Sequence, residues 1–181
     1  MDERLAWETL AAETAYTCEG FDVITETVRL PDGTETEFDY LSEGESVVIL
    51  PLTPDGDVVV IEEWRQAVRR VNYSLPAGSV ESEDDDLRTT VARELEEETG
   101  YEPGDVTHLT TVEPANGFSD AVFQYFLAED CMPTGERDLD YNESIQVTTT
   151  TVQSLREAAS NDALRDGRTM LGVLYYAAVE R

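Results

Sequence analysis

Lysine is missing from this chain altogether, and basic residues of any kind are scarce. Lysine and arginine together number 12, all of them arginine, against 40 aspartates and glutamates, and the formal net charge is −28. A protein that binds nucleic acid through its phosphates needs a cluster of cationic side chains. No stretch of the sequence supplies such a cluster, so we expect no nucleic-acid partner.

Cysteine and histidine are equally rare. Neither Cys18 nor Cys131 belongs to a close cysteine pair or to a cluster with His108, the single histidine. Zinc sites and redox centres use closely spaced cysteines and histidines, so both kinds of chemistry are disfavoured. A catalytic triad built on histidine is disfavoured too, and we interpret His108 as structural.

Long apolar runs are also lacking. No run approaches the roughly 18 residues that a membrane-spanning helix needs. The N-terminal segment MDERLAWETL is charged, unlike a secretory signal. We therefore expect no membrane partner and a cytoplasmic location.

Enough apolar side chains are nevertheless present, 40% of 181 residues, to bury one core, and we expect a single domain. The surplus of carboxylates resembles that of proteins from salt-loving (halophilic) organisms. In molar salt the Debye length falls to about 3 Å, which makes a dense acidic surface tolerable. An acidic surface that mimics nucleic acid or binds a basic protein remains the alternative.

The pattern of apolar and turn residues predicts strands mixed with helices. One hairpin is expected with strands at 21–30 and 34–41, and a second with strands at 47–50 and 58–61. The second pair is apolar on both faces, which indicates a central sheet covered on both sides. Further strands are expected at 106–112, 121–128 and 144–150, and helices at 86–99, 152–160 and 168–180. This order is typical of a layered α/β domain.

The helix at 86–99, which Gly100 ends, carries an unusual group of glutamates. Glu94, Glu97 and Glu98 stand at positions i, i+3 and i+4, so they share one helix face. Like charges this close repel, and divalent cations between them would remove the repulsion. Hard carboxylate oxygens suit magnesium. A solvated acidic face is the alternative interpretation.

The nine residues Arg93-Glu94-Leu95-Glu96-Glu97-Glu98-Thr99-Gly100-Tyr101 resemble the second half of the Nudix box, R-E-U-x-E-E-x-G-U, where U is a bulky apolar residue. Every fixed position is met. In the first half the family has glutamate, with seven residues between it and the arginine and five between it and a glycine. Counting back from Arg93 reaches Asp85, but six residues separate Asp85 from Gly78. The loop is thus one residue longer than the pattern, and the role of Asp85 is open.

Outside the box, the chain resembles the ADP-ribose pyrophosphatase branch of that family. The resemblance lies in six segments, Trp7-Glu8, Leu30-Pro31-Asp32-Gly33, Glu63-Trp64-Arg65-Gln66, Leu75-Pro76-Ala77-Gly78, Gly117-Phe118-Ser119-Asp120 and Asn142-Glu143. It implies a Nudix-type α/β/α sandwich with a central mixed sheet and an N-terminal antiparallel strand region. Residues 1–44 would form that region and mediate a homodimer, and residues 45–181 would form the core.

The resemblance also implies a reaction, the magnesium-dependent hydrolysis of a phosphoanhydride bond in a nucleoside diphosphate sugar. The best-matching substrate is ADP-ribose, a small nucleotide that would be split to AMP and ribose 5-phosphate. Manganese is an alternative to magnesium. Dinucleotides, other nucleoside diphosphate sugars and damaged nucleoside triphosphates remain open as substrates. So do an ADP-ribose-binding module without catalysis and an acidic interaction protein outside the family.

Roles for single residues follow by match to the branch. Glu94, Glu97, Glu98 and the Ala77 carbonyl are the expected metal ligands, and Glu97 is also assigned to catalysis. Arg93 would orient the catalytic carboxylates, with a surface ion pair as the alternative.

Three further residues are expected around the substrate. Glu143 is the candidate base or additional metal ligand, and Asp140 is its substitute. Arg65 would grip phosphate, unless it forms only a salt bridge. Phe118 would stack on a base or sugar, unless it packs in the core.

Overall fold

The computed structural model describes residues 3–135, 137–139 and 144–179. The helical elements are η1 (Glu3–Leu5), α1 (Leu87–Thr99), α2 (Val152–Ser160) and α3 (Gly167–Val179). The strands are β1 (Glu8–Thr17), β2 (Asp22–Arg29), β3 (Glu35–Ser42), β4 (Glu45–Pro51), β5 (Val58–Arg65), β6 (Arg70–Ser74), β7 (Ala77–Ser79), β8 (Tyr101–Glu102), β9 (Asp105–Val112), β10 (Val122–Glu129), β11 (Met132–Pro133) and β12 (Ile145–Thr150).

The chain forms two compact units. The smaller unit contains residues 1–45 and 113–122, and the larger contains residues 46–112 and 123–181. The domain organisation expected from the sequence remains a prediction. No helix in the described part of the chain is long and apolar enough to cross a membrane.

The smaller unit is built on an antiparallel sheet in the order β1-β2-β3. The hairpin expected at residues 21–41 is confirmed as β2 and β3. Its turn closes with hydrogen bonds from Gly33 N to Leu30 O and from Leu30 N to Thr34 O, both 2.9 Å, and Gly33 has a φ of 87° that favours glycine. Strand β1 was not expected from the pattern, and it is exposed at all ten positions.

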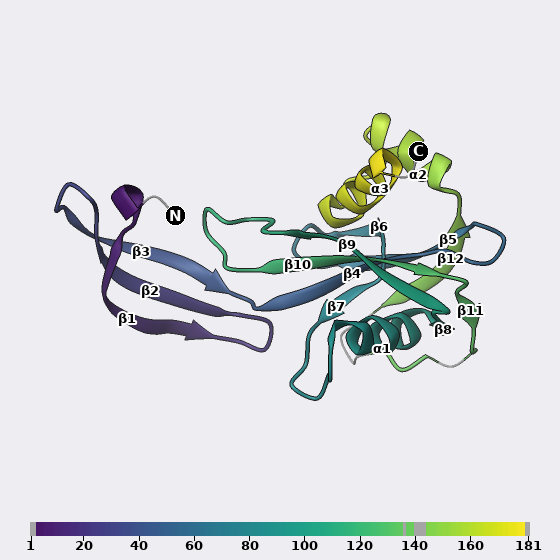
Figure 1. Cartoon of the computed structure of the whole chain (residues 1–181), viewed down its shortest axis with the longest axis horizontal. Coiled ribbons are helices and arrows are strands. Elements are labelled where there is room, and N and C mark those ends of the chain that lie inside the picture. Colours follow the sequence, from purple (N-terminus) through teal and green to yellow (C-terminus); the bar gives the residue numbers. More distant parts are fainter. Residues whose placement is uncertain (1–2, 136, 140–143, 180–181) are drawn as a thin grey trace. The chain divides into compact units, whose positions relative to one another are not determined.

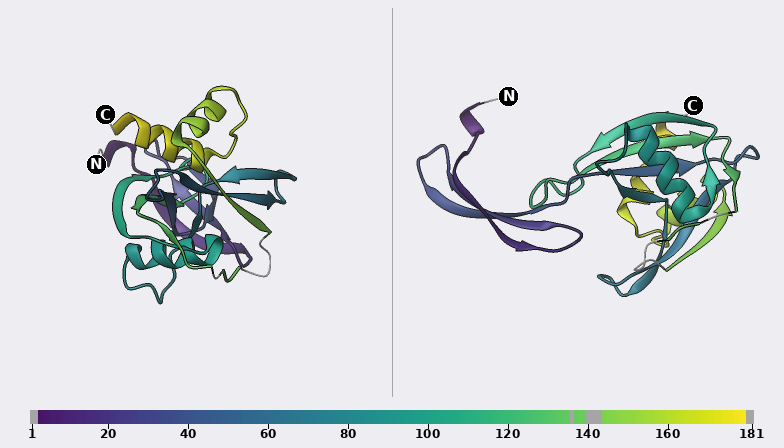
Figure 2. Two further views of the ribbon diagram at one scale, coloured as in Figure 1. Left: turned by 90° about the vertical axis from the view of Figure 1, so that its right-hand side faces the viewer. Right: turned by 90° about the horizontal axis from the view of Figure 1, so that it is seen from below.

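The larger unit has layers of strands between helices. One sheet has the order β7-β4-β10-β9 and another has the order β12-β5-β6. Helix α1 lies on one side of these strands, and α2 and α3 lie on the other (Figure 1), which a view turned by 90° also shows (Figure 2). The α/β class predicted from the sequence is therefore confirmed.

The expected pairing of the strands at 47–50 and 58–61 is wrong. The tight turn between them forms, with a hydrogen bond from Gly56 N to Thr53 O of 2.8 Å. Beyond one bridge between Leu52 and Val58, however, β4 and β5 enter different sheets. Both runs are apolar on both faces, so each gains more burial at the centre of its own sheet than as half of a hairpin.

The core of the larger unit lies on both sides of β4. Val48 and Leu50 pack with Tyr125 and Val173, toward α3. Val47 and Ile49 pack with Leu95 of α1 and other buried side chains, Val91, Val106, Phe126, Ala128 and Cys131. Removing an aliphatic side chain of this kind from water contributes about 1.5–3 kcal/mol. This burial holds α1 against the sheet and fixes which helix face points away from it.

Candidate active site

Helix α1 carries the glutamates singled out from the sequence, and both of its ends are capped. Asp86 accepts hydrogen bonds from the backbone N–H groups of Arg88 and Thr89 at the N-terminus. Gly100 adopts the left-handed conformation at the C-terminus, with a φ of 72°. With Val91 and Leu95 fully buried, the helix presents its charged face beside β7.

A cavity of about 380 Å³ opens between this face and the strand-loop segment that precedes the helix. Ala77, Arg93, Glu94, Glu97 and Glu98, the metal-site and orienting residues expected from the sequence, all line it. The other lining residues are Gly78, Ser79, Glu81, Asp138 and Leu139. The structure therefore brings the residues of the box helix and the Ala77 segment into one place.

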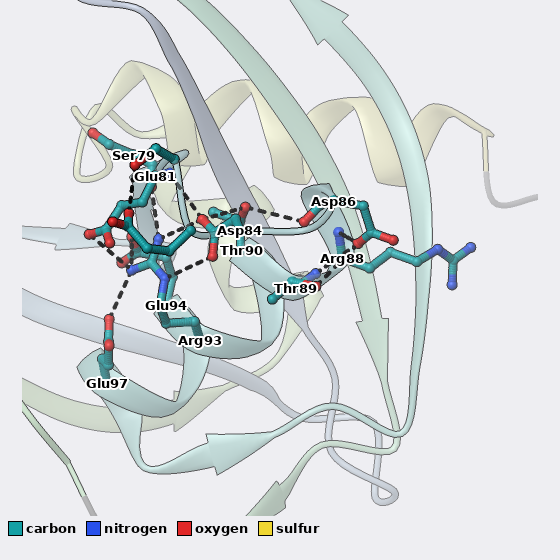
Figure 3. Close-up of polar contacts among 12 residues, drawn as sticks. Ser79, Glu81, Asp84, Asp86, Arg88, Thr89, Thr90, Arg93, Glu94 and Glu97 are labelled. Atoms are coloured by element: carbon teal, nitrogen blue, oxygen red, sulfur yellow. Dashed lines mark hydrogen bonds and ion pairs between the residues drawn. The ribbon is translucent and has the colours of Figure 1, made fainter.

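Arg93 is the central cation of the site (Figure 3). Its Nη1 donates to Oε1 of Glu94 at 2.8 Å and to Oε2 of Glu97 at 3.0 Å. Its Nη2 donates to the Ser79 carbonyl at 3.0 Å. The pKa of Arg93 lies above its ordinary value, chiefly because of the hydrogen bonds it donates to Asp84. Only 22% of the side chain of Arg93 is exposed.

Strand β7 lies in direct contact with Glu94 and Glu98 of α1. The Ala77 N–H donates to Oε2 of Glu98 at 3.1 Å, and Glu98 is buried. A Cβ added to Gly78 would lie 2.0 Å from Cδ of Glu94, so only glycine leaves room for this carboxylate. Ala77 thus orients Glu98 through its N–H group, and Gly78 leaves space for the carboxylate of Glu94.

The donor set fits a hard divalent cation in its chemistry. Five carboxylates line the cavity (Glu81, Glu94, Glu97, Glu98 and Asp138) and Arg93 is the one cation among the lining residues. Within the described ranges, no three acidic or histidine side chains already converge as an ion-binding group. Arg93 Nη1 lies between Glu94 and Glu97 instead. Arg93 contacts one oxygen of each of these two carboxylates, Oε1 of Glu94 and Oε2 of Glu97.

Asp84 is the functional candidate that the sequence interpretation missed. Its carboxylate contacts Arg93 through both oxygens, with Nε to Oδ1 at 3.2 Å and Nη2 to Oδ2 at 3.0 Å. Asp85, the position reached by counting back from Arg93, is exposed. A signal was present in the sequence, because counting forward from Gly78 with five intervening residues reaches Asp84.

Two of the remaining predicted residues, Arg65 and Phe118, are described and are not among the residues that line the cavity. The Nη2 of Arg65 lies 2.7 Å from Oε2 of the buried Glu63, as in the salt-bridge alternative. Phe118 belongs to the smaller unit, where its side chain is 59% exposed, so it is not a core residue there. Glu143 and Asp140 lie outside the described residues.

His108 of β9 contacts two side chains of β10. Its Nε2 lies 2.9 Å from Oε1 of Gln124, and its ring packs edge-on against Phe126. It is not among the residues that line the carboxylate cavity.

Comparison with known proteins adds to this geometry. The model of the NUDIX domain matches residues 43–170. An ADP-ribose pyrophosphatase of Bacillus subtilis (strain 168) is 28% identical over 169 residues, which cover 93% of this chain and 91% of the relative. A CMP-5'-(N-acetyl-N-hydroxy-3-aminopropyl)phosphonate hydrolase of Streptomyces rubellomurinus is 31% identical over 79% of this chain and 66% of the relative. A crystal structure of an ADP compounds hydrolase superimposes with a TM-score of 0.83 at 17% identity, covering 95% of this chain and 92% of that one.

Proposed function

The chain belongs to the Nudix family and is a pyrophosphohydrolase, and on this premise we propose that it splits ADP-ribose to AMP and ribose 5-phosphate with magnesium as its cofactor. The observation that carries the proposal is the carboxylate cavity beside α1. It gathers five acidic side chains from three segments of the chain around a single arginine.

The surplus of negative charge explains why a cation is needed before a substrate can bind. A diphosphate is itself an anion, and the lining residues would repel it. The chemistry that magnesium supplies when bound is charge neutralisation of the diphosphate and activation of water. Glu94, Glu98 and the Ala77 carbonyl would hold the ion, with Glu97 close by as a further ligand or support.

In the proposal, three side chains of the protein have separate roles in the reaction. Glu97 has the most exposed side chain of the three helical glutamates that line the cavity, and in the proposal it orients the attacking water. Arg93 holds Glu94 and Glu97 at 2.8 and 3.0 Å and limits their rotation. Glu143 remains the proposed base, which would accept a proton from the water as the P–O–P bond breaks.

Two of the relatives support the choice of substrate class. The Bacillus subtilis relative is an ADP-ribose pyrophosphatase that aligns over nearly the whole of both chains. A second ADP-ribose pyrophosphatase, from Mycobacterium tuberculosis, is 27% identical over 76% of this chain. The Streptomyces relative acts on a CMP compound, which keeps a different nucleotide as the second candidate substrate.

We also propose a homodimer formed through the N-terminal strands. Strand β1 lies at the edge of its sheet and is exposed along its whole length in the single chain. An uncovered edge strand can pair with a second chain. Leu10 and Tyr16 of this strand are among the exposed large apolar side chains that a partner would cover.

The test is a substrate panel in molar salt with magnesium, with manganese and with chelator, with products identified by mass spectrometry. ADP-ribose should give AMP and ribose 5-phosphate, with kcat/KM at least tenfold above other nucleotides, a difference of about 1.4 kcal/mol in transition-state binding. If a nucleoside triphosphate or a CMP compound had a kcat/KM tenfold higher than that of ADP-ribose, it would replace ADP-ribose as the proposed substrate.

Two variants complete the test. Glu94→Gln should reduce kcat by about 10²-fold or more with an unchanged circular dichroism spectrum, because it removes a ligand charge without changing shape. Glu96→Gln is the matched control, since Glu96 is on the same helix but exposed and outside the cavity lining. Turnover by Glu94→Gln equal to that of Glu96→Gln would contradict a metal-dependent reaction at this site.

A further inference from the structure

We infer that Thr169 of helix α3 is a positioning residue of the active site, which holds the backbone at Leu75 and Pro76 and, through it, Ala77. Helix α3 lies on the other side of the strands from α1 (Figure 1), and Thr169 is not among the residues that line the cavity. The inference rests on the proposed function, since it takes the Ala77 carbonyl as a ligand of the metal ion.

Leu75 and Pro76 form the crossing at which the chain leaves one sheet and enters another. Ser74 ends β6 in the sheet β12-β5-β6, and Ala77 begins β7 in the sheet β7-β4-β10-β9. Proline has no N–H group, so the Leu75 N–H is the one backbone donor that these two residues possess. Leu75 is buried, and a buried backbone donor needs a partner if the chain is to keep its course.

Thr169 supplies that partner with a fully buried side chain. Its Oγ1 accepts from the Leu75 N–H at 2.8 Å, and its hydroxyl donates to Oδ2 of Asp166 at 2.7 Å. The same oxygen of Asp166 accepts from the Thr169 N–H at 2.9 Å, at the start of α3. Because a carboxylate accepts, the hydroxyl proton is directed at Asp166 and a lone pair remains for Leu75.

Two further contacts hold the crossing. Gly172 follows Thr169 by three residues and shares its face of α3. A Cβ added to Gly172 would lie 3.0 Å from Cδ1 of Leu75, so this glycine lets the helix approach closely. From β4, the Ile49 N–H donates to the Pro76 carbonyl at 2.9 Å. The crossing is therefore fixed by both α3 and β4 immediately before the chain reaches the cavity.

The position of Ala77 depends on this crossing. Peptide units are planar and stiff, so a displacement at Leu75 is passed along the next peptide units to Ala77. Its N–H donates to Oε2 of Glu98 at 3.1 Å, and its carbonyl is a proposed metal ligand. Two of the proposed ligands therefore depend on Thr169, and its loss should weaken the site for a cation more than for the substrate.

The experiment compares Thr169→Val with Thr169→Ser. Valine has nearly the shape of threonine but no acceptor for the Leu75 N–H, whereas serine restores the hydroxyl. Thr169→Val should raise the magnesium concentration for half-maximal activity at least fivefold and lower kcat about 10-fold, because small displacements near the reacting groups are costly. KM for ADP-ribose at saturating magnesium should change less than threefold. Thr169→Ser should keep all three values within twofold of wild type.

Two measurements without turnover test the same contact. In Thr169→Val, the amides of Leu75 and Ala77 should exchange with solvent at least tenfold faster by NMR. Binding of Mn²⁺ without substrate, followed in molar salt by electron paramagnetic resonance, should weaken at least fivefold. Ser74→Ala is the matched control, because Ser74 is buried beside Leu75 and its hydroxyl has no hydrogen-bond partner among the described residues. It should leave exchange, Mn²⁺ binding and kcat at wild-type values.

Leu155→Val separates positioning from general stabilisation. Leu155 of α2 is buried in the same core cluster as Leu75, so its truncation should lower Tm without changing the magnesium requirement. If Thr169→Val does not fold, Thr169→Ala removes the same hydroxyl without placing a methyl group against the Leu75 N–H, and the same outcomes apply.

Three results would overturn the inference. They are a wild-type magnesium response in the folded Thr169 variant, a loss in Thr169→Ser as large as in Thr169→Val, and an equal rise in magnesium requirement in Leu155→Val. Failure of the proposed function is a different outcome, in which Glu94→Gln remains as active as Glu96→Gln. The exchange of the Leu75 and Ala77 amides still tests the contact of Thr169 in that case.

Discussion

The two compact units of this chain are stabilised in different ways. In the larger unit the four consecutive residues Val47 to Leu50 are all at most 1% exposed, and so are Val58 to Ile61. In the smaller unit only Val28 of the sheet β1-β2-β3 is a buried apolar residue, and β1 is exposed throughout. The larger unit has a packed apolar core, whereas the smaller unit is held together by strand pairing and polar contacts.

This difference in burial bears on where a catalytic site and the proposed contact with a second chain would lie. A reaction site needs carboxylates held to within fractions of an ångström, and a packed core provides that rigidity. The carboxylate cavity accordingly lies in the larger unit, on a helix whose inner face is fully buried. A three-stranded sheet without a core is of marginal stability on its own, which suits an element completed by a second chain.

The largest expected effect comes from truncating the core of the larger unit. Leu95→Ala should lower the free energy of unfolding by about 2–5 kcal/mol, because Leu95 is fully buried. Leu10→Ala in β1, where the side chain is 38% exposed, should cost less than about 1 kcal/mol. Denaturant unfolding in molar salt measures both. A large, concentration-dependent loss for Leu10→Ala would show that β1 is covered, as in the proposed homodimer.

Glycine substitutions in the two units provide a second contrast. Gly78→Ala should reduce kcat by about 10²-fold, since the new Cβ displaces the flexible end of Glu94 and leaves the backbone in place. Stability should change by less than about 1 kcal/mol. Gly117→Ala in the smaller unit is the control, because a Cβ there meets no atom within 4 Å. A Gly78→Ala enzyme with full activity would contradict the role of Glu94.

Salt should affect the smaller unit more than the larger. With a formal net charge of −28, both units should gain stability from dilute buffer to molar salt as repulsion is screened. The smaller unit has less burial to offset that repulsion, so amides of β2 should gain more protection from hydrogen exchange than amides of β4. Equal protection at low and high salt would contradict the interpretation of the composition as halophilic.

The smallest expected effect concerns Asp120 in the smaller unit. Its carboxylate accepts from the Glu43 N–H at 2.9 Å and from the Ser42 hydroxyl at 2.8 Å, which lowers its pKa below the ordinary value. A lowered folded pKa gives stability that is present above the unfolded value and lost as pH falls through the folded one. Asp120→Asn should therefore reduce Tm slightly at pH 7 and by a smaller amount at pH 2. A reduction of equal size at both pH values would exclude this cause.

Helix α1 of the larger unit could be predicted because the spacing of residues within one helix is visible in a short stretch of sequence. The spacing of Val91, Leu95 and the glutamates gave α1 and the charged face, and the structure has both. The pairing of β4 and β5 was predicted wrongly, since apolar runs buried on both faces do not specify their neighbours. Strand β1 has no burial pattern at all, so periodicity could not indicate it.

The placement of a site residue could be predicted where it depends on the residue's own helix. Arg93 and the glutamates fall in this class. Asp84 does not, because a loop one residue longer than the pattern can be aligned from either end and only three-dimensional contacts decide between Asp84 and Asp85. The contact of Arg65 with Glu63 likewise depends on side-chain orientation at the end of β5, which no spacing rule specifies.

The burial of Cys131 in the core of the larger unit has a practical consequence for chemical labelling. Burial raises the pKa of its thiol to about 12, so almost none of it is the reactive thiolate at neutral pH. Cys18, the other free cysteine, is partly exposed and follows β1 in the smaller unit. A maleimide dye or spin label should therefore attach to the unmodified protein at Cys18 alone, next to the strand whose pairing with a second chain remains to be measured.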